Sequence, residues 1–377
     1  MKVAIAQSNL TLKGGAEKVV LKIAQHYKAP IYVSEYDPSK TFEEFAKLDV
    51  RTIRKTGLLS KVPYTRATQG LSYGFGFYNL DLQDEFDVIN AHMAPSHWVR
   101  NKNERTLWYC HTPLRDIYDL YHYRMSMRKP HVRPIYMVGA AAVRHIDQRM
   151  VKQIPFILAN SSNIKARISK YYDRSDAKVL NGGVEYRNYS DKGDHRYFLY
   201  PSRVSPNKRQ EYAIEAFKLF SRKMKGYKLI ICGPVSKDGF YSDYYKQVKA
   251  FAGNSGRIEF MTTVSDRKLI DLYSRCTAVL YPPINEDYGL VPLEAMASGK
   301  PIIAVNEGGP RETVLHNKTG MLVNSPDEMA TAMFRLAKDA DLAARLGKAG
   351  RTHVEKEYSW EKFFTEFNKY LKMTSNI

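Results

Sequence analysis

Two glutamates lie on either side of a glycine, where an apolar strand is followed by an apolar helix. Glu286 occupies the loop, Glu294 lies one turn into a helix expected over residues 291–297, and Gly289 lies between them. The helix N-terminus at Leu290–Val291 offers free backbone N–H groups, which favour phosphate. Ionised carboxylates only accept hydrogen bonds, so the pair is suited to hold the hydroxyls of two sugars, a ribose and a hexose. A pair of solvated surface glutamates is the plainer alternative.

Two cations and a histidine follow other apolar strands. Arg203 and Lys208 lie five residues apart after the strand Tyr197–Tyr200, and together they can neutralise an anionic group. His111 lies just beyond the strand Thr106–Cys110. In open parallel sheets, ligands bind at the carboxyl ends of the strands, so all three residues are candidates for a site. Taken alone, the arginine and the lysine are ordinary surface residues, and the histidine only closes a loop through a hydrogen bond.

The elements that must position these residues form two series of alternating strands and helices. The first begins with the strand Val3–Gln7, the turn Gly14-Gly15 and a helix over residues 16–27. The second series begins with the strand Tyr197–Tyr200 and has the same alternation. Alternating strands and helices predict parallel sheets, so the chain is expected to be α/β with two doubly wound, Rossmann-like domains.

The boundary between the domains is expected near residues 184–196. This gives an N-terminal domain over residues 1–190 and a C-terminal domain over residues 191–358. A last helix over about residues 359–377 carries aromatic residues at helical spacing. Because such an apolar face must pack on something, we expect this helix to cross back to the first domain.

The segment around the glutamates, NEDYGLVPLEAMASGKPIIA, resembles the E-x7-E signature of retaining glycosyltransferase family 4. The resemblance extends along nearly the whole chain, through FLYPSRVSPNKRQEYAIEAF, GGAEK at residues 14–18, MTTV at 261–264 and EGGPRET at 307–313. It implies the GT-B fold, in which two Rossmann-like domains face each other across a cleft. It also implies that the chain is a glycosyltransferase that uses a nucleotide-diphosphate sugar as donor.

The resemblance assigns roles to the candidate residues. Arg203 and Lys208 would bind the donor diphosphate, and the Gly14-Gly15 loop would face the donor phosphate and the acceptor. The backbone at Val264 would border the nucleotide base. His111 would contact the donor sugar, polarising a hydroxyl or stabilising positive charge. Glu286, Gly289, Leu290, Val291 and Glu294 complete the donor site.

The chain departs from the family pattern at three places. Tyr288 stands where many relatives have Phe, Glu307 precedes the Gly-Gly element where a small or neutral residue is usual, and the Asn181-Gly182-Gly183 turn has an extra glycine. The role of Glu307 is therefore open. None of these changes removes a proposed catalytic group.

The family reaction needs no divalent ion, because the cations and the helix end stabilise the leaving diphosphate. We accordingly expect no metal site and no cofactor besides the donor substrate; the Asp81-x-x-Asp84 pair lies in an expected surface loop. The segment CHTPLR around His111 resembles the corresponding segment of bacterial and archaeal mannosyltransferases that assemble O-antigen-like or N-linked glycans. It favours GDP-mannose as donor, with a UDP-sugar as the alternative.

The formal charge of +19, larger in the N-terminal half, attracts polyanions. The stretch His97–Lys152 has 11 Lys and Arg against four Asp and Glu, and interleaves them with tyrosines and methionines (Tyr118, Tyr121, Tyr123, Tyr136, Met125, Met127, Met137 and Met150). Such a composition suits an anionic membrane surface and a lipid-linked saccharide or oligosaccharide acceptor. An ordinary helical hairpin with a core of aromatics is the alternative.

Scattered cysteines and the lack of an 18-residue apolar run favour a cytoplasmic protein, peripheral on the cytoplasmic face of a membrane. The charge also raises the possibility of nucleic-acid binding, but no nucleic-acid-binding motif occurs and acidic residues occupy the expected groove. The same architecture would also suit an enzyme that epimerises or hydrolyses a sugar nucleotide, but the Glu286–Glu294 segment favours transfer. The full set of charged residues argues against a catalytically idle scaffold.

Overall fold

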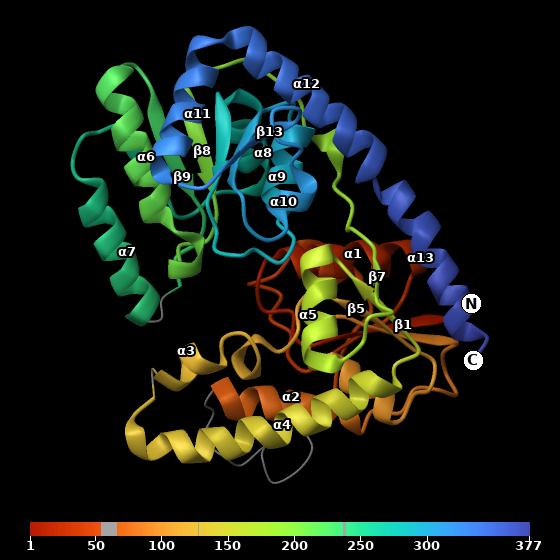
Figure 1. The fold of residues 1–377 in the computed structure, drawn as a ribbon. Helices are drawn as coiled ribbons and strands as arrows, with labels where there is room; N and C mark the ends of the chain where they lie inside the picture. The colour runs from red at the N-terminus through yellow and green to blue at the C-terminus, as the bar shows by residue number, and fades with distance from the viewer. Residues whose placement is uncertain (54–65, 127, 237–238) are drawn as a thin grey trace. The chain divides into compact units, whose positions relative to one another are not determined.

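The structure, a computed structural model, describes residues 1–53, 66–126, 128–236 and 239–377, with the backbone alone at 66–71. The chain forms two units. The first consists of Met1–Gly182 and Phe364–Ile377, and the second of Gly183–Phe363 (Figure 1).

The first unit is built on a seven-stranded sheet in the order β3-β2-β1-β4-β5-β6-β7, and every pairing is parallel. Its strands are β1 (Val3–Gln7), β2 (Ile31–Val33), β3 (Val50–Thr52), β4 (Val88–Ala91), β5 (Thr106–Cys110), β6 (Phe156–Ala159) and β7 (Lys178–Val179). Its α-helices are α1 (Gly15–Tyr27), α2 (Arg66–Tyr78), α3 (Tyr121–Ser126), α4 (Arg133–Gln153) and α5 (Ser162–Tyr172). Short 3-10 helices are η1 (Glu43–Lys47), η3 (Ser96–Asn101), η4 (Arg115–Ile117) and η5 (Pro130–Val132).

The second unit contains a six-stranded parallel sheet in the order β10-β9-β8-β11-β12-β13. Its strands are β8 (Tyr197–Pro201), β9 (Lys228–Cys232), β10 (Ile258–Met261), β11 (Ala278–Tyr281), β12 (Ile302–Val305) and β13 (Gly320–Val323). Its helices are η6 (Tyr186–Asn188), η7 (Pro206–Lys208), α6 (Gln210–Lys223), α7 (Gly239–Ala252), α8 (Asp266–Arg275), α9 (Leu290–Ala297), α10 (Pro310–Thr313), α11 (Pro326–Lys338) and α12 (Ala340–Glu357). The prediction of two parallel α/β sheets is confirmed.

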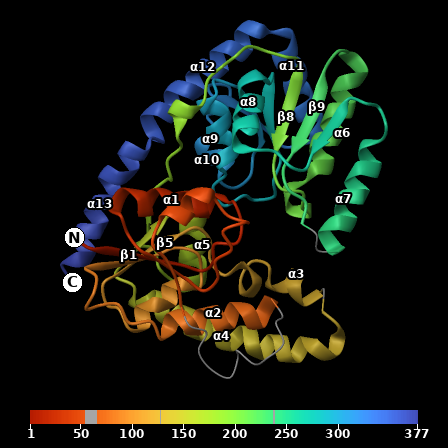
Figure 2. The same ribbon diagram turned by 180° about the vertical axis from the view of Figure 1, so that it is seen from behind.

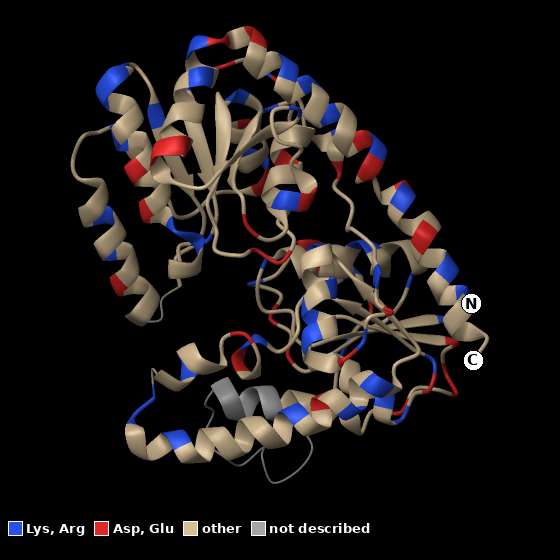
Figure 3. Cartoon of the chain, in the orientation of Figure 1, with Lys and Arg blue, Asp and Glu red and all other residues tan. Residues whose placement is uncertain are grey.

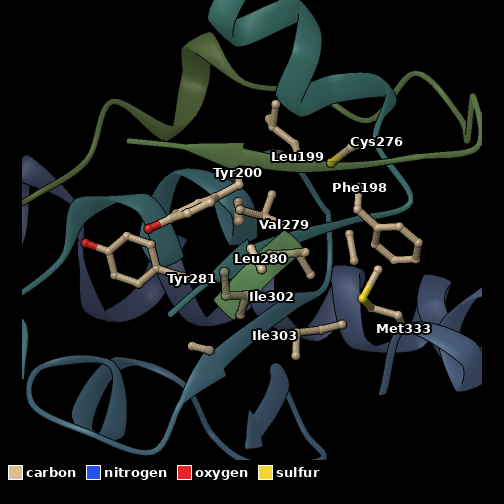
Figure 4. Close-up of a cluster of buried hydrophobic side chains, with 14 of the residues drawn as sticks. Phe198, Leu199, Tyr200, Cys276, Val279, Leu280, Tyr281, Ile302, Ile303 and Met333 are labelled. Carbon is tan, nitrogen blue, oxygen red and sulfur yellow. The ribbon is translucent and has the colours of Figure 1, made fainter. Parts of the chain in front are cut away.

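The core of the second unit is formed by the central strands. Because strands of a parallel sheet are covered by helices on both faces, successive residues of β8, β11 and β12 are all buried. Figure 4 shows the side chains of these strands packed against one another, with Met333 of α11 beside them. In the same view Tyr200 and Tyr281, which lie near or at the ends of neighbouring strands, lie side by side with their hydroxyls pointing the same way.

The last helix, α13 (Trp360–Ser375), begins in the second unit and ends in the first, as the sequence predicted. Its aromatic face packs on α1, where the rings of His26 and Phe364 stack with centroids 3.8 Å apart. The Tyr27 hydroxyl donates to Asn368 Oδ1 over 2.8 Å. Figure 2, which views the protein from behind, also shows α13 beside α1.

Charge and exposure set α3 and α4 apart from the rest of the first unit. No Asp or Glu occurs between Asp119 and Asp147, and Figure 3 shows Lys and Arg but no acidic residue along the N-terminal half of α4. The same segment exposes large apolar side chains: Tyr123, Val132, Ile135, Met137 and Val138. Among the expected aromatic and methionine residues, only Met150 is fully buried, and Met127 lies outside the described residues. Across the described ranges, none of the helices is both long and apolar enough to cross a bilayer.

Candidate active site

The strand order of the second unit places a switch point between β8 and β11. The chain winds from β8 toward β10 on one side and from β11 toward β13 on the other. Open α/β sheets bind ligands at the carboxyl ends of the strands that flank such a switch point. Lys208 lies in the loop after β8 and Glu286 in the loop after β11. The Lys208 ammonium and Glu286 Oε2 lie 2.5 Å apart, so the structure brings these two predicted residues together.

Hydrogen bonds to backbone carbonyls of the loop after β8 hold these residues in place. The Ile284 N–H donates to the Asn207 carbonyl over 2.9 Å, and the Tyr200 hydroxyl donates to the carbonyl of Lys208. Burial raises the pKa of Tyr200 well above its usual value, so its hydroxyl remains a donor. Both side chains of the ion pair are mostly covered, with 12% of Lys208 and 21% of Glu286 exposed.

Gly289 precedes the first turn of α9 and has a backbone φ of 83°. A Cβ there would lie 3.1 Å from Tyr281 Cε1 and would also require a conformation that L-residues rarely adopt. Glycine therefore lets α9 begin directly above the Tyr281 ring, with Leu290 and Val291 as its first residues. The start of the helix lies close to Glu286, since a Cβ on Gly289 would be 3.5 Å from Glu286 Cγ. The free amide groups and the positive end of the helix dipole there suit a phosphate group.

Glu294, in the middle of α9, is held by two tyrosines that the sequence did not single out. The Tyr273 hydroxyl of α8 donates to Glu294 Oε2 over 2.8 Å. Tyr189 also hydrogen-bonds to this carboxylate. Burial, followed by the charge of Glu294, raises the pKa of both tyrosines, which therefore stay protonated as donors. The carboxylate keeps further acceptor sites, so it can still hold the hydroxyls of a ribose.

The other predicted donor residues of this unit lie on neighbouring loops. The Arg203 side chain is exposed, while its carbonyl accepts from Gln210 Nε2 over 3.0 Å. Val264 follows β10, two strands away from β8, and is half-buried. Within the described residues, no group of three His, Cys, Asp or Glu side chains is arranged to hold a metal ion.

The remaining predicted site residues belong to the first unit. Its switch point lies between β1 and β4, and the Gly14-Gly15 turn follows β1 and begins α1. A Cβ on Gly14 would lie 2.4 Å from Glu17 Oε2, because the Glu17 carboxylate folds back over the helix N-terminus. His111 follows β5, one strand further along the sheet.

His111 has a partner that sequence reasoning missed. His92 follows β4, and its Nδ1 lies 3.0 Å from His111 Nε2, while its Nε2 lies 2.7 Å from Asn90 Oδ1. The Asn90 amide nitrogen donates to the Leu107 carbonyl, so Oδ1 is an acceptor and His92 Nε2 carries the proton. His92 Nδ1 then accepts the proton of His111 Nε2. This chain of hydrogen bonds leaves His111 Nδ1 as an acceptor, suited to a sugar hydroxyl.

Burial keeps both imidazoles neutral. It lowers the pKa of His111 to about 3 and that of His92 well below its usual value, with the neighbouring His111 adding to the effect. The signal for His92 was present in the sequence, since it directly follows the largely apolar run FDVINA at residues 86–91, as His111 follows its strand, but the pairing between the two strands could not be deduced.

The lowered pKa of His111 predicts how stability depends on pH. Below about pH 6.5 His111 binds a proton in the unfolded chain, whereas in the folded protein it does so only near pH 3. The contribution of this histidine to the free energy of unfolding is therefore greatest above pH 6.5 and decreases as the pH is lowered. The contribution of one such histidine is about 2 kcal/mol between pH 7.5 and 5. We expect His111→Gln to lose less stability over this interval than the parent protein, measured by urea unfolding at both pH values. His131→Gln, at an exposed position, serves as control; equal pH dependence in all three proteins would contradict the burial of a neutral imidazole.

The sequence is similar to those of known glycosyltransferases. Residues 184–353 match the family described as Glycosyl transferases group 1. The human alpha-1,3/1,6-mannosyltransferase ALG2 is 28% identical over 397 residues, which cover 95% of this chain and 92% of that protein. A GDP-mannose-dependent alpha-(1-6)-phosphatidylinositol monomannoside mannosyltransferase from Mycobacterium tuberculosis is 31% identical over 198 residues, or 50% of each chain.

Solved structures share the fold over almost the whole chain. Anabaena HepE in complex with UDP and glucose has a TM-score of 0.75 and 18% identity, covering 99% of this chain and 100% of that one. Sucrose-phosphate synthase from Thermosynechococcus elongatus has a TM-score of 0.76 and 18% identity, covering 99% of both chains. These similarities confirm the predicted fold class.

Proposed function

We propose that this chain, whose residues 184–353 match the glycosyl transferases group 1 family, transfers mannose from GDP-mannose to a lipid-linked or oligosaccharide acceptor with retention of anomeric configuration. The observation that carries the proposal is the Lys208–Glu286 pair at the switch point of the second unit, beside the N-terminus of α9. This arrangement offers positive charge for a diphosphate and an acceptor for sugar hydroxyls at the same edge of the sheet.

The choice of mannose is supported by the relatives. Human ALG2 is a mannosyltransferase, and the mycobacterial relative is a GDP-mannose-dependent mannosyltransferase of a phosphatidylinositol monomannoside. The name of the mycobacterial relative also includes a mannosylated lipid, phosphatidylinositol monomannoside, which supports a lipid-linked acceptor. A UDP-sugar donor would leave the site and its chemistry unchanged.

The reaction follows from the charges at the switch point. Lys208, Arg203 and the first amides of α9 neutralise the diphosphate as its bond to the anomeric carbon breaks. The acceptor hydroxyl forms its new bond on the face that the diphosphate leaves, and its proton passes to a departing phosphate oxygen. Glu286 holds hydroxyls of the transferred sugar and does not form a covalent bond with it. His111, neutral and presenting Nδ1, accepts from a sugar hydroxyl. No divalent ion takes part in these reaction steps.

A thermal-shift screen tests the donor. GDP, UDP and ADP with their common sugars, including GDP-mannose, are added with and without Mg²⁺. Binding to the folded state alone raises Tm by mass action, so we expect a rise with GDP and GDP-mannose that does not need Mg²⁺. A rise with UDP-sugars alone would overturn the choice of donor. Failure of every nucleotide to shift a folded sample would overturn the proposed function.

We further propose that the enzyme is peripheral on the cytoplasmic face of a membrane, with α3 and the N-terminal half of α4 against the lipid. The segment between Asp119 and Asp147 has no acidic residue, and Ile135 and Val138 are 74% and 72% exposed. Basic side chains beside exposed apolar ones suit an anionic lipid interface. The three cysteines (Cys110, Cys232 and Cys276) are free and buried, which fits a reducing compartment.

Co-sedimentation with vesicles of phosphatidylglycerol and phosphatidylcholine at low salt tests this surface. Inserting an Ile or Val side chain into lipid contributes about 1.5–3 kcal/mol, so we expect Ile135→Asp with Val138→Asp to weaken binding at least about tenfold. Met373→Asp, an exposed apolar residue of α13, is the control and should bind as the parent does. Equal binding of all three proteins, or no binding of the parent, would refute the assignment.

A further inference from the structure

Glu307 is the residue that the family pattern left without a role, and the structure gives it two partners. It follows β12 and lies about 39% exposed. Its Oε1 lies 2.8 Å from Arg209 Nη1. Its Oε2 accepts the backbone N–H of Asn285 over 3.2 Å. One carboxylate therefore joins the loop that follows β8 to the loop that follows β11.

Both partners of Glu307 are next in sequence to the ion pair of the site. Arg209 follows Lys208, and Asn285 precedes Glu286. The bridge through Glu307 thus runs parallel to the direct contact between Lys208 and Glu286, one residue away on each loop. A movement of Arg209 or Asn285 would move the neighbouring Lys208 or Glu286 with it.

Both partners also have positive φ angles, which L-residues rarely adopt, although asparagine does so more readily than arginine. Arg209 has a φ of 49° and Asn285 a φ of 41°. Such conformations persist where the surroundings hold them, and they are common at active sites. Glu307 supplies part of that constraint, because the Arg209 side chain and the Asn285 amide both bind its carboxylate.

The next two residues after Glu307 complete the support. The Gly309 N–H donates to the Glu286 carbonyl over 2.8 Å. A Cβ on Gly308 would lie 2.4 Å from that carbonyl oxygen, and one on Gly309 would lie 2.3 Å from the Tyr288 carbonyl oxygen. The backbone after β12 therefore packs directly against the backbone of the Glu286 loop, and Glu307 extends this contact to the Lys208 loop.

We propose that Glu307 and Arg209 are positioning residues that hold Lys208 and Glu286 in the geometry required for transfer. The inference rests on the proposed function, because it assigns the pair to that reaction. Glu307 is not proposed to touch the substrate. Its partners are surface-accessible, so the bridge contributes little to overall stability. A misplacement of catalytic groups by about 1 Å can nevertheless lower the rate roughly a hundredfold.

The test compares Glu307→Ala with Glu328→Ala. Glu328 is a matched control, since its Oε2 also accepts the backbone N–H of an asparagine, Asn324, over 2.8 Å in the same unit. We expect Glu307→Ala to lower kcat about 10–100-fold with little change in donor KM or Tm, and Glu328→Ala to match the parent. Should Glu307→Ala fail to fold, the isosteric Glu307→Gln, which keeps only one acceptor oxygen, takes its place.

A second comparison asks whether Glu307 acts through the ion pair. In a Lys208→Ala background, Glu307→Ala should lower the residual rate by less than about threefold, because residues that act as a unit are not additive. A full 10–100-fold further loss would overturn the positioning role, as would a parental kcat in the single variant.

A readout without substrate separates this inference from the proposed function. Amide hydrogen exchange of Asn285 and Gly309 should be at least about tenfold faster in Glu307→Ala than in Glu328→Ala, because the first variant frees the Glu286 loop. Unchanged exchange at both amides would overturn the inference even if the protein is an active transferase. Faster exchange in a protein that turns over no nucleotide sugar would uphold the bridge and refute the proposed reaction.

Discussion

Lys208→Ala is expected to lower kcat by roughly 10²–10³-fold and to leave the protein folded, because the ammonium stabilises the charge that develops on the leaving diphosphate. Glu286→Ala is expected to lose most activity as well, since Glu286 holds the sugar and contacts Lys208 directly. Steady-state release of nucleoside diphosphate measures both variants, and thermal unfolding checks that each is folded.

Lys228→Ala is the matched control for this experiment. Lys228 forms a 2.6 Å ion pair with Glu259 in the same unit, on β9 and β10, and is about 55% exposed. Removing a surface ion pair changes stability by about 1 kcal/mol or less and should not affect turnover. A folded Lys208→Ala enzyme with the turnover of Lys228→Ala would refute the role of Lys208 at the diphosphate.

Asp147→Leu is expected to lower the free energy of unfolding of the first unit by at least about 3 kcal/mol. Asp147 is fully buried and accepts four hydrogen bonds, all between 2.8 and 3.0 Å, from His97 Nε2, Trp98 Nε1, Tyr118 Oη and Tyr172 Oη. Leucine accepts none of them, so all four donors would lose this partner. Because Asp147 lies in α4, its loss also removes one of the contacts that hold this helix to the unit, beside those of Met150 and Val151.

Urea unfolding followed by tryptophan fluorescence measures this effect, since Trp98 and Trp108 are both buried in the first unit. Asp84→Leu, in an exposed turn, is the control and should change stability by less than about 0.5 kcal/mol. Equal midpoints for the two variants would show that the four hydrogen bonds around Asp147 contribute nothing net.

Much of the fold could be predicted because its strands are short apolar runs with clear ends. The bounds of β1 and β5 agree with the expected ranges, and β8 extends one residue beyond the expected strand Tyr197–Tyr200. Alternation with amphipathic helices then implied parallel sheets, and the GT-B resemblance is confirmed by the solved structures. Helices such as α7 (Gly239–Ala252) and α12 (Ala340–Glu357), many of whose residues are exposed, were not anticipated.

The candidate site could be predicted in part. Motif spacing identified Lys208 and Glu286, which lie 78 residues apart in sequence, but not that they form an ion pair. Contacts such as Tyr273 to Glu294, His92 to His111 and Glu307 to Asn285 depend on which strands are neighbours. The order of strands in a sheet cannot be deduced from local patterns in one sequence, so these partners were identified only from the structure.

The most direct test of the central claim is the configuration of the glycosidic bond that the enzyme makes. GDP-mannose is incubated with a mannose-terminated lipid-linked acceptor, and the product linkage is determined by NMR. We predict GDP release that depends on the acceptor and a new α-mannosidic bond, which retains the configuration of the donor. A β-linked product, or release of nucleotide without any transfer from GDP- or UDP-sugars, would contradict the account.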